Sequence, residues 1–301
     1  MPYWLLMPVL IAIVAILGYP LYKLVVLSFQ EYGLAQLIQH KGVWVGTANY
    51  ASVLHDPIFW HTLLRTVVFT VANVGLTLGL GTFLALLLVR VGSAVRILLT
   101  AGLVLVWSMP VVVAVQVWYW ITNYQNGILN YALTRLHIGD YELHDWYATT
   151  FSKLAMVTLL IVWGALPFVT ITLYAGLSQV SRELVEAAEI DGAGKARRFR
   201  SIIFPLLLVS TAPLAISSFA VGFNNLGLVL LFNNGGPPIP GAPYALGYTD
   251  ILATAIYDIS GVSGGKADFG LASALAIIVF IIVGIIAVIT FRQTRRLEEY
   301  Q

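Results

Sequence analysis

The sequence predicts an all-α membrane protein with six transmembrane helices, and three observations support this fold class. Of the 301 residues, 59% are hydrophobic and only 10% are charged, whereas soluble domains carry roughly 25% charged residues. The mean hydropathy is +0.87. Long apolar runs with almost no charge alternate with polar segments that hold nearly all the charge. We therefore expect a single membrane domain over residues 1–301.

Six apolar runs are the expected spans. A helix of about 20 apolar residues crosses the hydrocarbon core of a bilayer, and each run is long enough to do so. The runs cover residues 3–28, 63–89, 97–120, 154–177, 205–230 and 269–291. An even number of spans places both termini on the same side of the membrane.

Basic residues indicate which side that is. They gather in segments 90–96 and 179–204 and in the tail after residue 291. Short cytoplasmic loops of membrane proteins carry an excess of Lys and Arg, so these segments and both termini are expected to face the cytoplasm. The outward segments are then 29–62, 121–153 and 231–268.

Four prolines lie in or near the expected spans. Proline lacks the backbone N–H donor and tends to bend or interrupt a membrane helix. Bent helices can leave a cavity between them, although a proline can also serve packing alone. The residues are Pro20, Pro110, Pro167 and Pro213.

Composition and motifs exclude several functions. The net charge of +2 is too small to indicate a nucleic-acid partner. Cysteine is absent, and neither a metal-ligand set nor the signature of a zinc or serine hydrolase is present. The run Gly192-Ala193-Gly194-Lys195 lacks the first glycine and the metal-binding hydroxyl of a phosphate loop. The chain is therefore not expected to be an enzyme, to bind ATP or to carry a cofactor of its own.

The spans themselves are nearly free of ionisable groups. Carriers driven by ion gradients keep such groups near the middle of the membrane, but Lys23 and Arg65 lie near span ends, where they are expected to reach the headgroups. The most polar feature is Asn224-Asn225 beside Phe223. Because burying an unpaired amide costs about 1–3 kcal/mol, this pair is expected to join helices or to contact a ligand.

The segment 181–204 predicts two short helices on the basic side of the membrane. Ser181 can cap the first helix, and Glu183 is favourably placed in its opening turn. Asp191-Gly192 ends this helix, and Pro205 begins the fifth span, where its missing donor is tolerated. Such a pair of helices can lie in a groove on another protein.

This segment resembles the EAA loop of membrane subunits of binding-protein-dependent ABC importers. The matching pattern is Glu186-Ala187-Ala188, three residues, Gly192, nine residues, and Ile202-Ile203-Phe204-Pro205, with Phe204 where the family has leucine. The resemblance implies the type I ABC importer permease fold, with 181–204 as the coupling loop that docks on a separate ATP-hydrolysing subunit. It implies polar contacts by Glu186, close approach at Ala187 and Ala188, and a turn at Asp191-Gly192 before Pro205.

The second half of the chain is similar to the larger membrane subunit of bacterial maltose and maltodextrin importers. The matches include 187–193, 223–225, 234–237, 247–250 and 268–272. In that relative the sugar lies mid-membrane, stacked on aromatic rings and bonded to asparagine. The resemblance thus implies sugar contacts by Trp163, Phe168, Phe223, Asn224 and Asn225.

The resemblance implies a multi-pass permease of the bacterial inner membrane that works by alternating access. The expected cargo is maltose, maltodextrin or a related α-glucoside such as trehalose. The implied partners are a second permease subunit, two ATP-binding-cassette subunits that bind ATP and Mg²⁺, and an extracytoplasmic sugar-binding protein. An ion-coupled carrier or channel is the alternative. The sequence leaves open the sugar, the binding protein and whether the second permease is a different chain.

Overall fold

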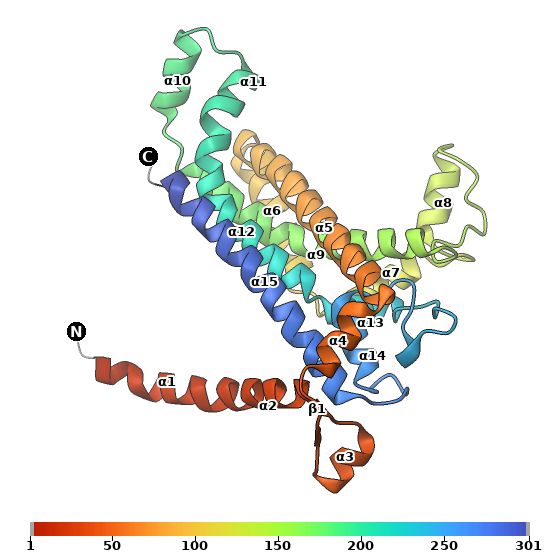
Figure 1. The fold of residues 1–301 in the computed structure, drawn as a ribbon. Coiled ribbons are helices and arrows are strands. Elements are labelled where there is room, and N and C mark those ends of the chain that lie inside the picture. Colours follow the sequence, from red (N-terminus) through yellow and green to blue (C-terminus); the bar gives the residue numbers. More distant parts are fainter. Residues whose placement is uncertain (1–2, 299–301) are drawn as a thin grey trace. The chain divides into compact units, whose positions relative to one another are not determined.

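The computed structural model describes residues 3–298 and is mostly helical (Figure 1). Within these residues four helices are long and apolar enough to cross a membrane, and the number rises to six if each of two bent pairs is one span. The single helices are Met7–Ser28, Pro57–Arg90, Thr150–Ser178 and Phe269–Thr290, and the pairs are Ser93–Trp107 with Val111–Ile121 and Lys195–Leu207 with Thr211–Phe223. The described chain thus supplies four to six spans where six are expected.

The chain divides into two compact units. The first contains the residues up to Thr66 together with Gly235–Gly284, and the second contains Val67–Asn234 together with the residues from Ile285 onward. Two long helices, α5 (Pro57–Arg90) and α15 (Phe269–Glu298), therefore contribute residues to both units. The single domain over 1–301 stays a prediction.

The first expected span is helical over its whole length. A 3-10 turn at Tyr3–Leu6 leads into α1 (Met7–Ile13), a π turn at Val14–Gly18 and α2 (Tyr19–Ser28). The wider π turn lies directly before Pro20. Because proline cannot donate to the carbonyl four residues earlier and crowds it, a π turn lets the helix continue past it.

The rest of the first unit is built from short elements. Strands β1 (Gln30–Glu31) and β2 (Val43–Trp44) pair antiparallel around α3 (Leu34–Gln39), and α4 (Ala48–His55) follows. The Asn49 side-chain amide in α4 donates to the carbonyls of Ser28 and Gln30 at 3.0 and 2.9 Å. These bonds fix the hairpin at the end of α2. Later in the chain, α14 (Leu252–Ile259) follows a loop with a 3-10 turn at Pro243–Ala245.

Helix α5 begins earlier than the apolar run predicts. The run starts at residue 63, whereas α5 starts at Pro57. The Asp56 carboxylate accepts the backbone N–H of Ile58 at 2.8 Å, so an aspartate cap followed by proline in the first turn starts the helix. Capping chemistry, rather than hydropathy, sets this boundary.

The second unit holds the remaining helices around a small apolar core. Its members are α6 (Ser93–Trp107), α7 (Val111–Ile121), α8 (Ile128–Arg135), α9 (Thr150–Ser178), α10 (Arg182–Ile190), α11 (Lys195–Arg198), α12 (Phe204–Phe223) and α13 (Leu226–Asn233). The core includes Ala85, Val169, Leu173 and Leu214. A Cβ atom at Gly81 would lie 2.7 Å from Cγ1 of Val169, so glycine allows α5 to approach α9 closely.

Two predicted spans are interrupted. The run 97–120 is broken at Pro110, where α6 and α7 meet at 103°. Within the run 205–230, helix α12 ends at Phe223, and helix α13 starts after Asn224-Asn225. A bend of 65° also lies between Leu207 and Thr211. Pro213 has no N–H to donate to the backbone carbonyl four residues earlier, and that carbonyl lies in the bend. Proline thus bends the helix near 110 and 213, whereas Pro167 lies inside α9 without ending it.

Candidate functional site

The segment 181–204 forms the expected pair of short helices, α10 and α11. Ser181 is the N-cap of α10, and its hydroxyl accepts the backbone N–H of Glu183 at 3.2 Å. Glu183 lies in the first turn, where its negative charge suits the positive end of the helix dipole. The predicted cap is therefore confirmed. In Figure 1 the two helices extend beyond the end of α12.

Gly192 ends α10 in a Schellman motif. Its φ of +77° lies in the left-handed region, which glycine adopts without steric cost. The N–H of Gly192 donates to the Glu189 carbonyl at 3.0 Å, and the N–H of Ala193 donates to the Ala188 carbonyl at 2.9 Å. These two bonds satisfy carbonyls that a helix end leaves free. The turn predicted at Asp191-Gly192 is confirmed.

An ion pair holds the two short helices together. Arg198 in α11 lies 2.8 Å from the Glu189 carboxylate in α10, with 14% of the arginine side chain and 65% of the glutamate side chain exposed. Helix α11 continues through a π turn at Phe199–Ile203 into α12, whose first turn contains Pro205. The loop is thus joined without a gap to the helix behind it.

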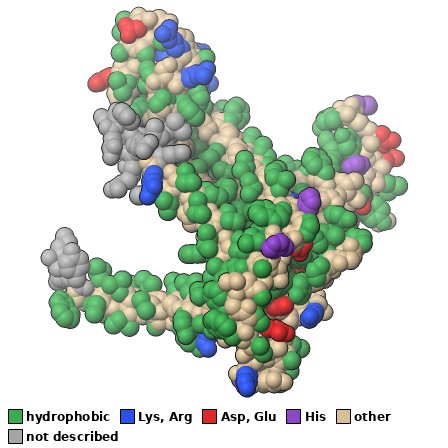
Figure 2. Space-filling view, viewed as in Figure 1, with side chains coloured by type: hydrophobic (Ala, Val, Ile, Leu, Met, Phe, Trp, Pro, Cys, Tyr) green, Lys and Arg blue, Asp and Glu red, His purple; other side chains and the backbone are tan. Residues whose placement is uncertain are grey.

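The outer surface of α10 presents apolar and polar side chains to solvent. Glu186 and Ala187 are exposed, and Ala188 is half-buried. Leu184 and Ile190 are 53% and 86% exposed. Exposed apolar side chains bordered by charge are typical of surfaces that bind another protein. Figure 2 shows acidic and basic side chains around this end of the second unit.

The two aromatic candidates for sugar contact in α9 each lie against a tryptophan. In α9, the Phe168 ring stacks on Trp107 of α6 with centroids 6.4 Å apart, and Trp163 meets Trp118 of α7 edge to face at 6.0 Å. Phe168 is 52% exposed. Sequence reasoning missed Trp107 and Trp118. Their positions on either side of Pro110, in a broken helix, are the signal that would have identified them.

The candidates at the α12–α13 junction have structural partners. Phe223 is fully buried and stacks on Phe219 at 5.6 Å, so in this structure its ring is packed. The Asn224 amide donates to the Ala220 carbonyl at 3.1 Å, and the Asn225 side-chain oxygen accepts the N–H of Leu228 at 3.3 Å. Asn225 therefore caps α13. Sugar contact by these residues and by Trp163 and Phe168 stays a prediction.

Helix α5 carries a polar stripe that sequence reasoning missed. Its buried members recur every three or four residues, a spacing that puts them on one helix face, and they are Thr62, Thr66, Thr70, Asn73 and Thr77. In the described structure, Oγ1 of Thr70 and Oδ1 of Asn73 are buried without a hydrogen-bond partner. Buried polar atoms normally have partners, so these two oxygen atoms are left able to accept a hydrogen bond.

Arg65 corrects one prediction about the span ends. It was expected to reach the lipid headgroups, but its guanidinium donates to the Gly247 carbonyl at 3.1 Å inside the first unit. The N–H of Gly247 in turn donates to the Asp250 carboxylate at 2.6 Å, and the Leu252 N–H donates to the Thr66 hydroxyl at 2.9 Å. These contacts attach the loop before α14 to the start of α5.

Two buried carboxyl groups lie beside this contact. Burial raises the pKa of Asp250, although the Gly247 N–H and the Arg65 charge favour its ionised form. Burial, together with the charge of Asp250, raises the pKa of Asp258 to about 7. At neutral pH this pair therefore binds more protons than two exposed carboxyl groups would.

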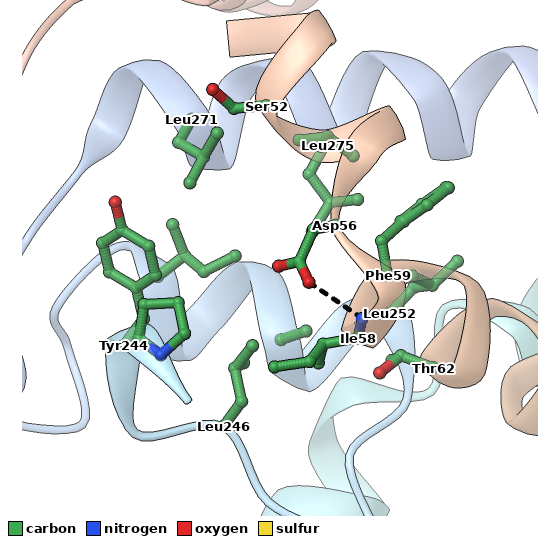
Figure 3. A pocket seen from close by; sticks show the side chains of 14 residues that line it. Ser52, Asp56, Ile58, Phe59, Thr62, Tyr244, Leu246, Leu252, Leu271 and Leu275 are labelled. Carbon is green, nitrogen blue, oxygen red and sulfur yellow. Dashed lines mark hydrogen bonds between the residues drawn. The ribbon is translucent and has the colours of Figure 1, made fainter. Parts of the chain in front are cut away.

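A small apolar cavity lies in the first unit (Figure 3). Its volume is about 240 Å³, and apolar side chains, chiefly leucine and isoleucine, form most of its wall. Two of the polar groups in its wall already have partners, since Asp56 accepts the N–H of Ile58 and the Tyr244 hydroxyl donates to Asp268 at 3.0 Å. A sugar needs a partner for most of its hydroxyl groups. This cavity therefore suits an apolar group instead.

Comparison with known proteins identifies the family. The sequence model described as "Binding-protein-dependent transport system inner membrane component" matches residues 77–298. The chain belongs to this family. It is an integral inner-membrane permease subunit of an ABC importer and not an enzyme, since ATP hydrolysis in such importers resides on a separate subunit. The predicted family and membrane location are confirmed.

Two relatives of this permease are named for sugar transport. The diacetylchitobiose uptake permease DasB of Streptomyces coelicolor is 40% identical over 94% of this chain and 83% of the relative. The maltose/maltodextrin permease MalF of Escherichia coli is 33% identical over 84% of this chain and 49% of the relative. The resemblance to the maltose subunit is confirmed, and the identity to DasB is higher. The chain spans about half the length of MalF.

Solved importers share the fold of this permease. A bacterial alginate ABC transporter in complex with an alginate-bound periplasmic protein matches 98% of this chain and 94% of its own, with a TM-score of 0.76 and 17% identity. An amino acid ABC transporter matches 82% of this chain with a TM-score of 0.52 and 16% identity. Among the described residues, no group of three or more His, Asp or Glu side chains is arranged to hold a metal ion.

Proposed function

We propose that this permease is a membrane subunit of an ATP-driven importer for an uncharged disaccharide or short oligosaccharide. DasB and MalF, named for diacetylchitobiose and maltose or maltodextrin, support this cargo class. The α-glucosides expected from the sequence, maltose, maltodextrin and trehalose, stay candidates. Diacetylchitobiose is the second candidate because the identity to DasB is 40%.

The geometry of the α10–α11 pair carries the proposal. The Schellman turn at Gly192 and the ion pair between Glu189 and Arg198 give a short hairpin of helices with a defined form. Its exposed residues, including Glu186 and Ile190, supply the mixture of charge and apolar surface that a docking helix needs. In the proposed function this loop docks on the ATPase subunit and transmits its motion to α12.

The sugar path is proposed along α6, α7 and α9. The stacked or edge-on rings of Trp107 with Phe168 and of Trp118 with Trp163 offer aromatic faces, and the apolar faces of sugars stack on such rings. No charged residue lies between Leu154 and Ser178 of α9. A phosphorylated cargo would favour a basic partner there, so neutral sugars fit better.

Alternating access is the proposed mechanism. ATP-driven closure of two ATPase subunits, which bind ATP and Mg²⁺, moves the coupling loop and opens the path toward the extracytoplasmic sugar-binding protein. Sugar influences this cycle by stabilising one state more than another. The proposed complex also contains a second permease. Six spans with both termini in the cytoplasm complete the proposal, and the terminal residues 1–2 and 299–301 lie outside the described residues.

ATP hydrolysis by the intact complex tests the cargo. The tagged permease is purified with its partner subunits, reconstituted with its binding protein, and assayed with maltose, maltotriose, trehalose, sucrose, diacetylchitobiose and glycerol phosphate. We expect a neutral di- or oligosaccharide to stimulate hydrolysis. If no ATPase copurifies and uptake follows an ion gradient, the ion-coupled alternative replaces the proposal.

Matched variants test the coupling loop in the same assay. Glu186→Gln and Gly192→Ala are expected to lose sugar-stimulated hydrolysis, because they alter the docking surface and the left-handed turn. Gly194→Ala is the control, since a Cβ at Gly194 meets nothing within 4 Å. Equal losses in the two variants and the control would contradict the assigned roles.

A further inference from the structure

A hollow lined by basic and apolar side chains lies between the end of α5 and the α10–α11 loop. Its volume is about 430 Å³. Three cationic residues line it, Arg90 from α5 and Lys195 and Arg198 from α11, and within the described part of the chain no acidic residue does. All of these residues belong to the second unit.

The charges in this hollow are not fully neutralised. Arg198 is paired with Glu189 at 2.8 Å, whereas Arg90 and Lys195 are exposed. Among the residues that the structure describes, no acidic side chain pairs with Arg90 or Lys195, so two positive side chains remain to attract an anion. The backbone carbonyls of Leu88, in α5, and of Val91, just after it, accept hydrogen bonds from the guanidinium of Arg96 at 2.9 and 3.0 Å.

The apolar part of the wall indicates what kind of anion fits. Leu86, Phe199 and Ile203 lie beside the cations, so a ligand with a charged end and an apolar body can satisfy both. Arg90 is also the last residue of α5. Because it directly follows the apolar stretch of a membrane helix, it is expected at the level of the lipid headgroups.

We propose that this hollow binds the phosphate of an anionic phospholipid headgroup, with Arg90 and Lys195 as its ligands. Basic pockets between membrane helices on the cytoplasmic side are suited to such headgroups. The inference rests on the proposed function, in which the α10–α11 loop is cytoplasmic. A lipid bound here contacts both the end of α5 and the coupling loop, and thereby holds the loop against the membrane surface.

Native mass spectrometry of the intact complex tests lipid binding without sugar or nucleotide. The detergent-purified complex is titrated with phosphatidylglycerol or phosphatidylcholine of matched chains. We expect phosphatidylglycerol to bind preferentially, and Arg90→Gln and Lys195→Gln each to weaken it about fivefold. Arg200→Gln is the matched control, because this exposed arginine of the same segment does not line the hollow.

The source of the phosphate is decided by competition. If millimolar inorganic phosphate displaces the lipid from the wild type, the hollow is a phosphate site filled from solution as well as from the membrane. Equal weakening in Arg200→Gln overturns the proposal, because binding then follows net charge. Loss of the ATPase subunit from Arg90→Gln and Lys195→Gln, with lipid binding unchanged, also overturns it and assigns these cations to a protein contact. Stimulation of ATP hydrolysis by sugar is measured in a separate assay. If no sugar stimulates hydrolysis, the result for lipid binding can still be interpreted.

Discussion

The loop before α14 and the loop of α10 and α11 use charged residues in opposite ways. In the first unit, Asp250 is 1% exposed and accepts a backbone N–H at 2.6 Å. In the second unit, Glu189 is 65% exposed and makes one ion pair. Removing a partner from a buried charge costs several kcal/mol, whereas an exposed pair contributes about 0–1 kcal/mol. The first loop is built for rigidity, and the second is able to exchange its contacts for those of a partner.

The largest effect is expected at Gly247 in the buried loop. A Cβ atom there would lie 2.0 Å from the Gly235 carbonyl oxygen. The position of a Cβ is fixed by its own backbone, and the oxygen belongs to the backbone of Gly235, so neither atom can rotate away. Gly247→Ala is expected to lower the free energy of unfolding by on the order of 3 kcal/mol. Thermal unfolding of the purified complex measures this. Gly227→Ala is the control, because a Cβ there meets nothing within 4 Å. If the two variants have the same melting temperature, the conclusion that the loop before α14 is rigid is wrong.

The next effect concerns pH and Asp258. Its pKa is about 7 in the folded protein and about 4 in an unfolded chain, so the folded state binds more protons between these values. The contribution of Asp258 to stability is therefore fully present below about pH 4 and is lost as the pH rises toward 7. Melting temperatures of Asp258→Asn should depend less on pH than those of the wild type. Glu142→Gln, at an exposed carboxylate, should keep the wild-type slope.

The smallest effect on stability is expected at the ion pair of the exposed loop. Glu189→Gln removes the partner of Arg198, but Glu189 is mostly exposed, so the loss should stay near 0.5 kcal/mol, roughly 2 °C in melting temperature. Sugar-stimulated ATP hydrolysis should fall more clearly, because α10 is no longer held to α11. The exchange Glu189→Arg with Arg198→Glu should restore part of it. If Glu189→Gln loses much stability but keeps normal sugar-stimulated ATP hydrolysis, the contrast drawn between the rigid loop before α14 and the exposed loop of α10 and α11 is wrong.

Local chemistry explains which parts of this fold could be predicted. The first span, the Ser181 cap and the Gly192 turn depend on neighbouring residues, and each agrees with the sequence. The early start of α5 at Pro57 was missed because hydropathy outweighed the Asp56 cap. The partner of Arg65 was not predictable in this way, since Gly247 lies 182 residues further along the chain.

The candidate site shows the same limit. Asn224-Asn225 marks a real interruption of a helix, but the pattern alone does not distinguish a cap from a ligand contact, and Asn225 caps α13. The positions of Trp107 and Trp118 on either side of Pro110 are visible in the sequence, but their contacts with Phe168 and Trp163 depend on the bend there. Pairings between helices depend on bends whose angles the sequence does not state.

The break at Pro110 also changes what kind of surface a membrane protein can offer inside the bilayer. Helix α6 has 15 residues and is about 22 Å long, shorter than a hydrocarbon core of about 30 Å. In the proposed arrangement of six spans, two half-helix ends therefore meet at membrane depth, and the first N–H groups of α7, from Val111 onward, have no acceptor within their own helix. Main-chain dipoles at such a junction can hydrogen-bond to hydroxyl groups or water without any charged side chain. A permeation path can thus be polar where its side chains are apolar.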